Sequence, residues 1–481
     1  MNISLVNSLG GRREEFVPPA GRDIKMYTCG VTVYDDCHVG HARSLYVFEV
    51  IRRFLNVACA PEGKRVRLIR NITDVDDKII QKAQAVCQKE QCSLTEAFDR
   101  VRTRYIESYY EDLKLLELPA ADLEPKATEH IPQMLEYIRQ LIARGVAYEA
   151  AGNVYFSVRK FPSYGLLSGK KIDDLLTSVR IEPDPHKRDP LDFALWKSAK
   201  QDEPSWQSPW GLGRPGWHIE CSVMSQRLLD TATLDIHGGG RDLVFPHHEN
   251  ERAQSEALTG KVFARYWIHH GLLTINGQKM AKSLGNFFTI KDVLRKYHPD
   301  VLKLLFLHAH YASPVDFSWD KMEEAQRAYE RLDIFRGKLQ RYLAASPQAD
   351  AQPSPPAAFS RFRDEFMAAL ADDFNMPQAL AAVFEATNEC NKLLDASPVG
   401  ACAVLQDASL FLKEASQIFC LTFSKAQDGV TEQEIEIKIQ ERLAFKKARN
   451  FSAADALRDE LQKQGVILED TKDGTTWRRS I

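Results

Sequence analysis

The sequence predicts an α/β fold built on a parallel β-sheet, with an inserted segment and a helical region after it. Residues 23–30 (DIKMYTCG) alternate like a strand and break at a glycine, and residues 66–74 (VRLIRNITD) form a second strand candidate. Residues 42–55 between them have a helical pattern. Strand, helix and strand make a βαβ unit, which implies that ligands bind at the carboxyl ends of the parallel strands.

An inserted domain is predicted where the pattern changes near Glu124. Residues 126–145 read as an amphipathic helix, with Thr128 as its cap and Gly145 as its stop. Four aliphatic side chains share one face of this helix: Ile131, Leu135, Ile138 and Ile142. The Pro- and Trp-rich chain that follows, to about Pro209, completes the insertion.

The chain after the insertion is predicted to return to the sheet and then to become helical. Sheet-like segments recur at residues 233–240 and 265–277, so the first domain is completed only there. Beyond Asp316 the pattern is helical, with a long amphipathic stretch at residues 322–343. Residues 345–358 (ASPQADAQPSPPAA) are predicted to form a flexible loop.

A small unit ends the chain, in which Ser452 is predicted to cap a helix that stops near Gly465. Cations and one tryptophan gather here: Arg442, Lys446, Lys447, Arg449, Trp477, Arg478 and Arg479. Cations for phosphates beside an aromatic ring for an unpaired base suit a single-stranded nucleic-acid loop. The alternative is a solvated helix with a core tryptophan.

Composition bounds the class of protein. A chain of 481 residues exceeds one compact core, which predicts two to four domains. No apolar run approaches the ~18 residues that cross a bilayer, and no secretory signal is evident, so we expect no membrane contact and a cytoplasmic location. Nine cysteines without small-domain spacing argue against a disulfide framework. A net charge of -3 is uninformative about nucleic-acid binding.

The motif HVGH places His38 and His41 three residues apart, where a helix begins after the first predicted strand. Free backbone N–H groups at a helix N-terminus favour phosphate, and Gly40 lets a nucleotide approach the backbone. Such a pair is weak evidence alone, since a structural role is equally compatible with it.

The stretch GQKMAKSLGN carries Lys279, Lys282 and Ser283 on a glycine-flanked loop. A mobile cationic loop suits the clamping of a phosphate chain as charge moves during transfer. A lone loop of this kind is usually a solvated surface, but here it accompanies HVGH.

Together these segments resemble the class I aminoacyl-tRNA synthetases, whose HIGH and KMSKS signatures are similar to HVGH and KMAKS. TCGVTVYDDCHVGHAR, NITDVDDKI, GRPGWHIECSVM, DIHGGGRDLVFPHHENERAQSEA and GTTWRR resemble the cysteinyl-tRNA synthetase family in particular. The resemblance covers essentially the whole chain. Val39 replaces a packing isoleucine, and Ala281 removes one hydroxyl from the lysine loop.

The resemblance implies one zinc ion per chain, bound by Cys29, Cys221, His247 and Glu251. Two thiolates, one imidazole and one carboxylate suit Zn²⁺, and His247 and Glu251 lie four apart, on one helical face. His248 is the nearest rival, because its spacing to Glu251 also fits one face; the family alignment favours His247. The other cysteines are predicted to be packing residues: Cys37, Cys59, Cys87, Cys92, Cys390, Cys402 and Cys420.

The resemblance also implies an amino-acid pocket, lined by Cys29, Thr73, Trp217, His237 and Asp242. Each has a plainer interpretation. The tryptophan could belong to the core, the glycines around His237 could form a hairpin, and capping alone explains the carboxylates that follow Thr73. Those carboxylates are Asp74, Asp76 and Asp77, and His218 follows the tryptophan.

The implied reaction joins L-cysteine to tRNA(Cys) in two steps, through cysteinyl-adenylate and with release of pyrophosphate. His38, His41 and Lys282 would stabilise charge on the transferring phosphate, Lys279 would assist, and Mg²⁺ would accompany ATP. Gly40, Lys282 and Ser283 would contact the nucleotide. Zinc would select the substrate thiolate over the hydroxyl of serine. A monomer is expected.

The implied domains are a Rossmann-like catalytic domain in two halves (1–120 and 210–318), an inserted connective domain (121–209), a helical tRNA-binding domain (319–425) and a small anticodon-recognition unit (426–481). Three rivals remain: a ligase that joins cysteine to an amino sugar, a non-catalytic paralogue and a zinc hydrolase. The long chain beyond residue 316, the intact motifs and the absence of an HExxH pair argue against them in turn.

Overall fold

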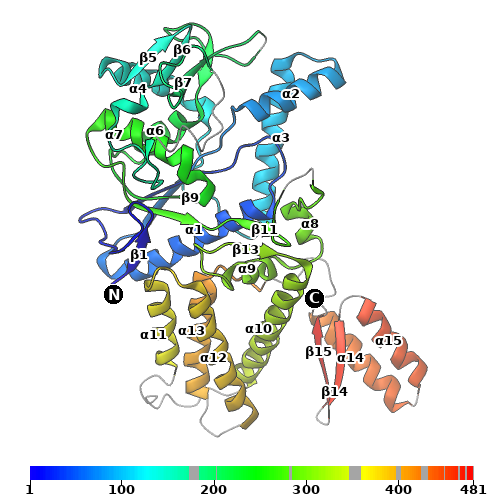
Figure 1. Ribbon diagram of the computed structural model, residues 1–481. Coiled ribbons are helices and arrows are strands. Elements are labelled where there is room, and N and C mark those ends of the chain that lie inside the picture. Colours follow the sequence, from blue (N-terminus) through cyan, green and yellow to red (C-terminus); the bar gives the residue numbers. More distant parts are fainter. Residues whose placement is uncertain are drawn as a thin grey trace.

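The computed structural model describes residues 1–172, 184–201, 203–280, 284–345, 359–396, 402–423, 432–448, 450–463, 466–471 and 474–479. An inserted domain lies on one side of a parallel sheet and a helical domain on the other, with a small C-terminal unit beside the helices (Figure 1). The site motifs lie at the sheet, between these outer parts.

The parallel sheet has four strands in the order β10-β9-β3-β4. They are β3 (Ile24–Thr28), β4 (Val66–Arg70), β9 (Leu234–Gly240) and β10 (Ala264–His270). Most of their residues are buried whichever face they point to, as expected for a parallel sheet covered by helices. Both early strands and the return of the sheet after the insertion are confirmed.

Helices and one hairpin surround the sheet. Helix α1 (Val39–Ala58) joins β3 to β4, as predicted, but begins and ends beyond residues 42–55. Helix α6 (Trp217–Leu228) leads into β9, and α7 (Glu249–Thr259) joins β9 to β10. The antiparallel hairpin of β1 (Ser4–Asn7) and β2 (Arg12–Glu15) packs beside β10. The described residues also form short turns of 3-10 or π type: Ala60–Glu62, Ala127–His130, Val158–Lys160, Arg241–Leu243 and Val244–His248.

Between β4 and β9 the chain forms two packed helices and, after a third helix, an antiparallel sheet (Figure 1). The helices are α2 (Asp77–Glu90) and α3 (Leu94–Leu115), and α4 (Ile131–Ala143) precedes the second sheet. That sheet has the order β5-β6-β7-β8: β5 (Ala147–Ala150), β6 (Asn153–Phe156), β7 (Phe193–Ser198) and β8 (Gly213–Pro215). The domain division at residue 209 stays a prediction. Strand β8, which follows residue 209 in the chain, still pairs with this antiparallel sheet.

The predicted cap of α4 is wrong. The helix begins after His130, which makes no side-chain capping bond. Thr128 instead donates its hydroxyl to Asp74 Oδ2 (2.7 Å) and its N–H to Asp74 Oδ1 (2.9 Å). Thr128 therefore bonds to the buried carboxylate of Asp74, distant in sequence, and does not cap the helix as its local sequence suggests. Gly145 follows the helix with φ 71°, so the stop is confirmed.

The chain after β10 forms a small sheet and then helices. The sheet has the order β12-β11-β13: β11 (Leu273–Ile275), β12 (Gln278–Lys279) and β13 (Val315–Phe317). Helices α8 (Ile290–Leu294) and α9 (Pro299–Leu307) precede the helical domain, which comprises α10 (Trp319–Ala345), α11 (Ser360–Ala371), α12 (Met376–Ala396) and α13 (Cys402–Ile418). The predicted helix at 322–343 lies within α10. The predicted loop lies, after Ala345, outside the described residues.

Buried polar contacts tie the segment after α13 of the helical domain to α1 and α9. Lys303 on α9 donates to Asp300 Oδ1 and to the Cys420 carbonyl, both at 2.8 Å. Asp300 Oδ2 accepts the N–H groups of Thr422 and Phe423 (2.9 and 2.7 Å). Tyr46 on α1 donates its hydroxyl to the Phe419 carbonyl at 2.7 Å. The chain end of α13 is therefore fixed against both α1 and α9.

The C-terminal unit contains α14 (Glu432–Lys447), α15 (Phe451–Lys463) and the antiparallel pair β14 (Val466–Thr471) and β15 (Gly474–Arg479). It has an apolar cluster of its own: Ile435, Ile439, Leu461, Val466 and Leu468. Asn450, rather than Ser452, caps α15, because Asn450 Oδ1 accepts the N–H of Ala453 at 3.2 Å. Gly465 lies outside the described residues.

One residue predicted to contact nucleic acid belongs instead to the packing of this unit, and a second takes part in that packing but stays partly exposed. Arg442 is 1% exposed and donates to Thr475 Oγ1 at 3.5 Å, so it is not available to a phosphate. Trp477 packs on the apolar cluster and donates Nε1–H to Glu436 Oε1 at 3.1 Å. Arg449 and the side chains of Arg478 and Arg479 lie outside what the structure describes.

The prediction that the seven other cysteines are buried packing residues is confirmed for four, and Cys87 and Cys92 pack against the core while partly exposed. Cys37, Cys59, Cys390 and Cys420 are buried, whereas three are partly exposed at helix ends or in a connection: Cys87, Cys92 and Cys402.

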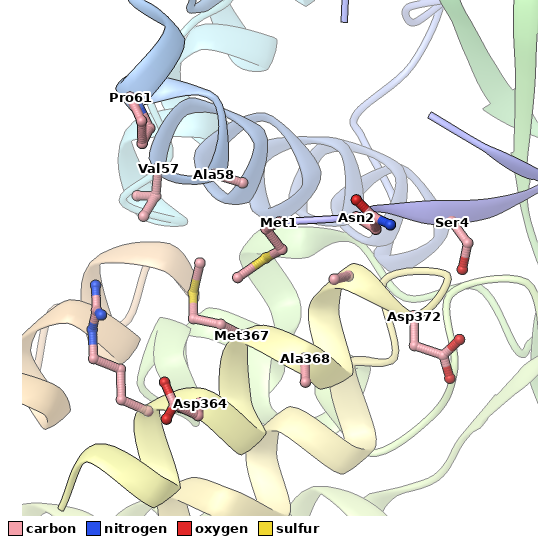
Figure 2. Close-up of a pocket in the computed structure, with 12 residues that line it drawn as sticks. Met1, Asn2, Ser4, Val57, Ala58, Pro61, Asp364, Met367, Ala368 and Asp372 are labelled. Carbon is pink, nitrogen blue, oxygen red and sulfur yellow. The ribbon is translucent and has the colours of Figure 1, made fainter. Parts of the chain in front are cut away.

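A cavity of about 610 Å³ lies between the end of α1, the N-terminal residues and α11. Figure 2 shows Val57, Ala58 and Met1 facing Met367 and Ala368 of α11 across it. None of its lining residues belongs to the sequence motifs. Among the described residues, no helix has the length and apolar character needed to span a membrane.

Candidate functional site

Two thiols, an imidazole and a carboxylate meet at the carboxyl end of the parallel sheet. Cys29 directly follows β3, and Cys221 lies on α6. His247 lies in the turn before α7, and Glu251 in the first turn of that helix. Because β3 and β9 are neighbours, the helix that follows β9 begins over the end of β3. The topology thereby joins residues that are up to 222 positions apart in the chain.

The spacing of these four residues, here called the metal cluster, fits a tetrahedral ion. Their ligand atoms all lie within 4.8 Å of one another. Cys29 Sγ and Cys221 Sγ are 3.7 Å apart, close to the ~3.8 Å expected of two sulfurs bound ~2.3 Å from one tetrahedral zinc. His247 Nε2 lies 3.5 Å from Cys221 Sγ and 2.9 Å from Glu251 Oε1. The donor set of two sulfurs, one nitrogen and one oxygen suits zinc.

A second set overlaps the first. It keeps Cys29 and Glu251 but takes its imidazoles from His237 and His248, and its ligand atoms also lie within 4.8 Å of one another. His237 Nε2 is 2.8 Å from Glu251 Oε2, and His248 Nε2 is 3.2 Å from Cys29 Sγ. Distances alone keep both sets open. The first has two thiols and is therefore the better set for a thiophilic ion.

The buried charges of the metal cluster depend on one another. Burial raises the pKa of Cys221, but hydrogen bonds with Cys29 and His247 outweigh it and lower that pKa. Burial lowers the pKa of His247, but the Glu251 carboxylate and Cys221 outweigh it and raise that pKa. The positively charged His247 imidazole thus stabilises the negative charges of Cys221 and Glu251. A divalent cation bound between them would stabilise the same charges.

The predicted pocket residues lie around the metal cluster, apart from one. Trp217 stacks on His247 with ring centroids 4.1 Å apart and is 38% exposed, so it is not a core residue. His237 is fully buried against Glu251. Thr73, also buried, donates to Glu220 Oε2 (3.2 Å), while its N–H donates to the Val31 carbonyl (3.0 Å).

Asp242 differs from the other predicted pocket residues. It is exposed in the turn after β9, and its charge acts on His38 and His270. It therefore lies toward the HVGH motif rather than beside the sulfurs.

The two histidines of HVGH are fixed by the start of α1. His38 is the N-cap, and its Nδ1 accepts the N–H groups of Gly40 (3.1 Å) and His41 (3.3 Å). His41 Nδ1 accepts the N–H of His38 in return, and the two rings stack 3.8 Å apart. Burial lowers the pKa of His38 to about 4, against the opposing charge of Asp242, and lowers that of His41 as well. Both rings are therefore neutral hydrogen-bonding groups at pH 7.

The lysine loop begins beside this helix start. The Met280 methyl group lies 3.7 Å from where a Cβ on Gly40 would be. Beyond the loop, the N–H of Val39 donates to the Phe288 carbonyl at 3.1 Å, and His38 forms a β-bridge with Thr289. The two motifs, 240 residues apart, are therefore neighbours. Lys282 and Ser283 lie outside the described residues, as does the side chain of Lys279, so their roles stay predictions.

The carboxylates after Thr73 have structural partners, as the plainer interpretation holds. Asp76 caps α2 by accepting the N–H of Lys78 at 2.9 Å. Asp77 pairs with Lys197 (2.9 Å) and with Arg214. Asp74 accepts from Thr128, as described above.

The chain is similar to known proteins over its full length. The family described as "tRNA synthetases class I (C) catalytic domain" matches residues 15–327, and the DALR domain matches residues 365–424. Curated proteins named cysteine–tRNA ligase are similar over the full length. Those of Persephonella marina and Aquifex aeolicus are 46% identical over 100% of this chain and 99–100% of theirs. That of Pseudomonas syringae is 45% identical over 99% of each.

The chain belongs to the cysteine–tRNA ligase family. It is an enzyme, a class I aminoacyl-tRNA synthetase. A solved structure of methionyl-tRNA synthetase from Mycobacterium tuberculosis, in complex with methionyl-adenylate, matches 83% of this chain and 92% of that one with a TM-score of 0.62. At 15% sequence identity this likeness shows the shared class I fold alone.

Three residues beside the metal cluster escaped prediction as site residues. Glu220 and Asn71 support Thr73 by hydrogen bonds, and nothing in their local sequence marks them. His269 contacts His248 (2.7 Å) at the carboxyl end of β10. A signal for this residue existed, because a histidine that ends a strand beside β9 shares the sheet edge with the other site residues.

Proposed function

We propose that zinc bound by Cys29, Cys221, His247 and Glu251 selects cysteine through its thiolate, in the ligation that this family member catalyses. The chain joins cysteine to tRNA at the expense of ATP. The observation that carries the proposal is the approach of two thiols within 3.7 Å, beside a buried imidazole and carboxylate, where the parallel strands end. Zinc would supply a soft Lewis acid there, which binds sulfur far better than a hydroxyl.

The residues around the cluster would hold the amino acid. Trp217 is exposed enough to contact a bound side chain, and its stacking on His247 keeps that imidazole oriented. Cys29 is the partly exposed member of the cluster, and the N–H of the next residue, Gly30, donates to Asn71 Oδ1 at 2.9 Å. Thr73 and His237, both buried, would support the residues that contact the amino acid, through hydrogen bonds to Glu220 and Glu251.

The residues of HVGH and of the lysine loop would act on ATP. The neutral rings of His38 and His41, fixed by the start of α1, would donate hydrogen bonds to the phosphate as negative charge develops. Lys279, Lys282 and Ser283 would clamp the outer phosphates with the Mg²⁺ that accompanies ATP. Asp242, whose charge acts on His38, would lie between the two half-sites. Transfer to the 3′-terminal adenosine of tRNA(Cys) would follow.

A tRNA acceptor fits the chain better than an amino sugar does. The helical domain and its match to the DALR domain add a region that the amino-sugar ligases resembling this catalytic core lack. A monomeric state and a cytoplasmic location stay predictions. Gel filtration checks the first.

The test is metal content together with one substitution. Protein purified without chelator is expected to carry about one zinc per chain. Cys221→Ser should weaken cysteine binding at least ~10-fold and leave ATP binding nearly unchanged, because the ion contacts only the amino acid. Cysteine-dependent pyrophosphate exchange, run with serine alongside, measures both affinities. Absence of zinc from the parent protein would refute the proposal, and equal loss of both affinities would indicate misfolding.

A further inference from the structure

A line of hydrogen bonds leads from the metal cluster to the N-terminal hairpin. His248 Nε2 lies 3.2 Å from Cys29 Sγ. His248 Nδ1 lies 2.7 Å from His269 Nε2, and His269 Nδ1 lies 2.8 Å from the Ser8 hydroxyl. His248 is fully buried and His269 is 5% exposed. One continuous series of hydrogen bonds thus connects four residues from four separate segments. The reaction described above assigns no role to this series.

Hydrogen-bond chemistry gives this line a direction. A neutral imidazole has one N–H donor and one bare nitrogen acceptor, and a thiolate can only accept. If Cys29 is a thiolate, His248 must donate Nε2–H to it, which leaves His248 Nδ1 as the acceptor. His269 must then donate Nε2–H to His248 and accept the Ser8 hydroxyl at Nδ1. Each of the three contacts has one donor and one acceptor in this arrangement.

The Ser8 end of the line is held firmly. The N–H of Ser8 donates to the Trp267 carbonyl of β10 at 2.9 Å, two residues before His269. The Asn7 side chain accepts the N–H of Trp267 at 3.0 Å. Ring packing holds the imidazoles, because His269 and Trp267 are nearly parallel (5°) and His248 lies 5.5 Å from the same tryptophan. The hydroxyl and both rings therefore meet in fixed positions.

We propose that Ser8 and His269 are positioning residues that orient His248 as a hydrogen-bond donor to the Cys29 thiolate. This inference rests on the proposed zinc site. It also assigns a role to the rival histidine, which acts as a donor to a ligand and not as a ligand. Hydrogen-bonded partners of metal ligands typically change metal affinity 10- to 100-fold when they are removed.

The experiment compares zinc affinity, by competition with a chelator, in full-length variants. His269→Leu removes the donor to His248, and zinc affinity is expected to fall ~10- to 100-fold. His269→Gln keeps an amide N–H near the position of Nε2 and should recover most of the loss, and Ser8→Ala should give an intermediate loss. His270→Leu is the matched control, because His270 is buried on the same strand and, among the described residues, forms its hydrogen bond locally, to the Gly271 carbonyl at 2.9 Å. Its zinc affinity should equal that of the parent.

Cobalt(II) in place of zinc provides a readout that loss of stability alone would not move. Removing a hydrogen bond from a metal-bound thiolate makes it a stronger electron donor, so the sulfur-to-cobalt absorption band of His269→Leu should shift to longer wavelength at unchanged ligand number. A parent protein without a metal site would refute the proposed function and this inference together. A parent that binds zinc, with His269→Leu equal to it in affinity and spectrum, would overturn the inference alone. A changed cobalt coordination pattern in that variant would overturn it too, because His248 would then be a ligand.

Discussion

At the scale of single residues, the start of α1 depends on the absence of a side chain at position 40. A Cβ there would lie 2.9 Å from both Cε1 and Nδ1 of His38. The same Nδ1 accepts two N–H groups of the first turn, so the ring cannot move aside without losing the cap. Gly40 therefore fixes the geometry of HVGH, whichever way its nucleotide approaches.

Gly40→Ala is expected to slow cysteine-dependent pyrophosphate exchange by ~10-fold or more, because the displaced His38 ring no longer meets the phosphate in the right orientation. Loss of the cap should also lower the free energy of unfolding by ~1 kcal/mol. Gly337→Ala is the matched control. Gly337 lies within α10 with nothing within 4 Å of a new Cβ, so this change should leave exchange intact and stabilise the helix by ~0.5–1 kcal/mol. Normal exchange in Gly40→Ala would contradict the role given to this turn.

At the scale of elements, a buried ion pair within α9 holds the segment that follows α13 through further hydrogen bonds. The side chains of Lys303 and Asp300 are 1% and 0% exposed and lie 2.8 Å apart. Asp300 also accepts two backbone N–H groups that follow α13. A buried pair of this kind adds little stability over an apolar pair, but removing one partner strands the other charge.

Asp300→Ala should therefore reduce the free energy of unfolding by ~3–5 kcal/mol, measured by urea unfolding. The control is Glu389→Ala, which breaks the exposed pair with Lys392 (42% and 72% exposed) and should change stability by less than ~1 kcal/mol. Similar small effects of the two substitutions would show that the buried pair does not join the domains.

At the scale of the whole molecule, the C-terminal unit packs around its own apolar cluster, apart from the core shared by the rest of the described chain. Of its candidate nucleic-acid contacts, Arg442 is buried in that packing, whereas Trp477 packs on the cluster but stays partly exposed, so its contact with a base stays a prediction. Lys446 and Lys447, in the last turn of α14, remain as candidates for phosphate contacts. The residues proposed to act in adenylate formation all precede this unit in the chain.

Deleting the residues after 430 should preserve cysteine-dependent pyrophosphate exchange and cut tRNA aminoacylation at least ~10-fold, with tRNA binding that is weaker and less salt-dependent. Aminoacylation is measured at tRNA concentrations well below saturation. A truncated protein that charged tRNA at the full-length rate would refute anticodon recognition by this unit. Loss of exchange as well would indicate that the unit is needed for folding.

Local sequence determined those features whose physical causes are local. Strand alternation before Gly30, the helix that begins at HVGH and the stop at Gly145 follow from side-chain period, capping and backbone freedom within a few residues. The motifs themselves, taken together, were specific enough to indicate the family. The resemblance also named the four residues of the metal cluster, whose ligand atoms the structure brings within 4.8 Å of one another, and metal binding by them stays a prediction.

Only the tertiary structure decided which groups each side chain meets. Thr128 and Ser452 look like helix caps in the sequence. In the structure Thr128 bonds to Asp74 instead, and Asn450 caps the helix assigned to Ser452. Arg442 looks like a surface cation, yet it is buried. The line from Cys29 through His248 and His269 to Ser8 joins segments up to 261 residues apart. Burial and hydrogen-bond partners are settled by whichever groups the fold brings within about 3 Å, and no local pattern carries that information.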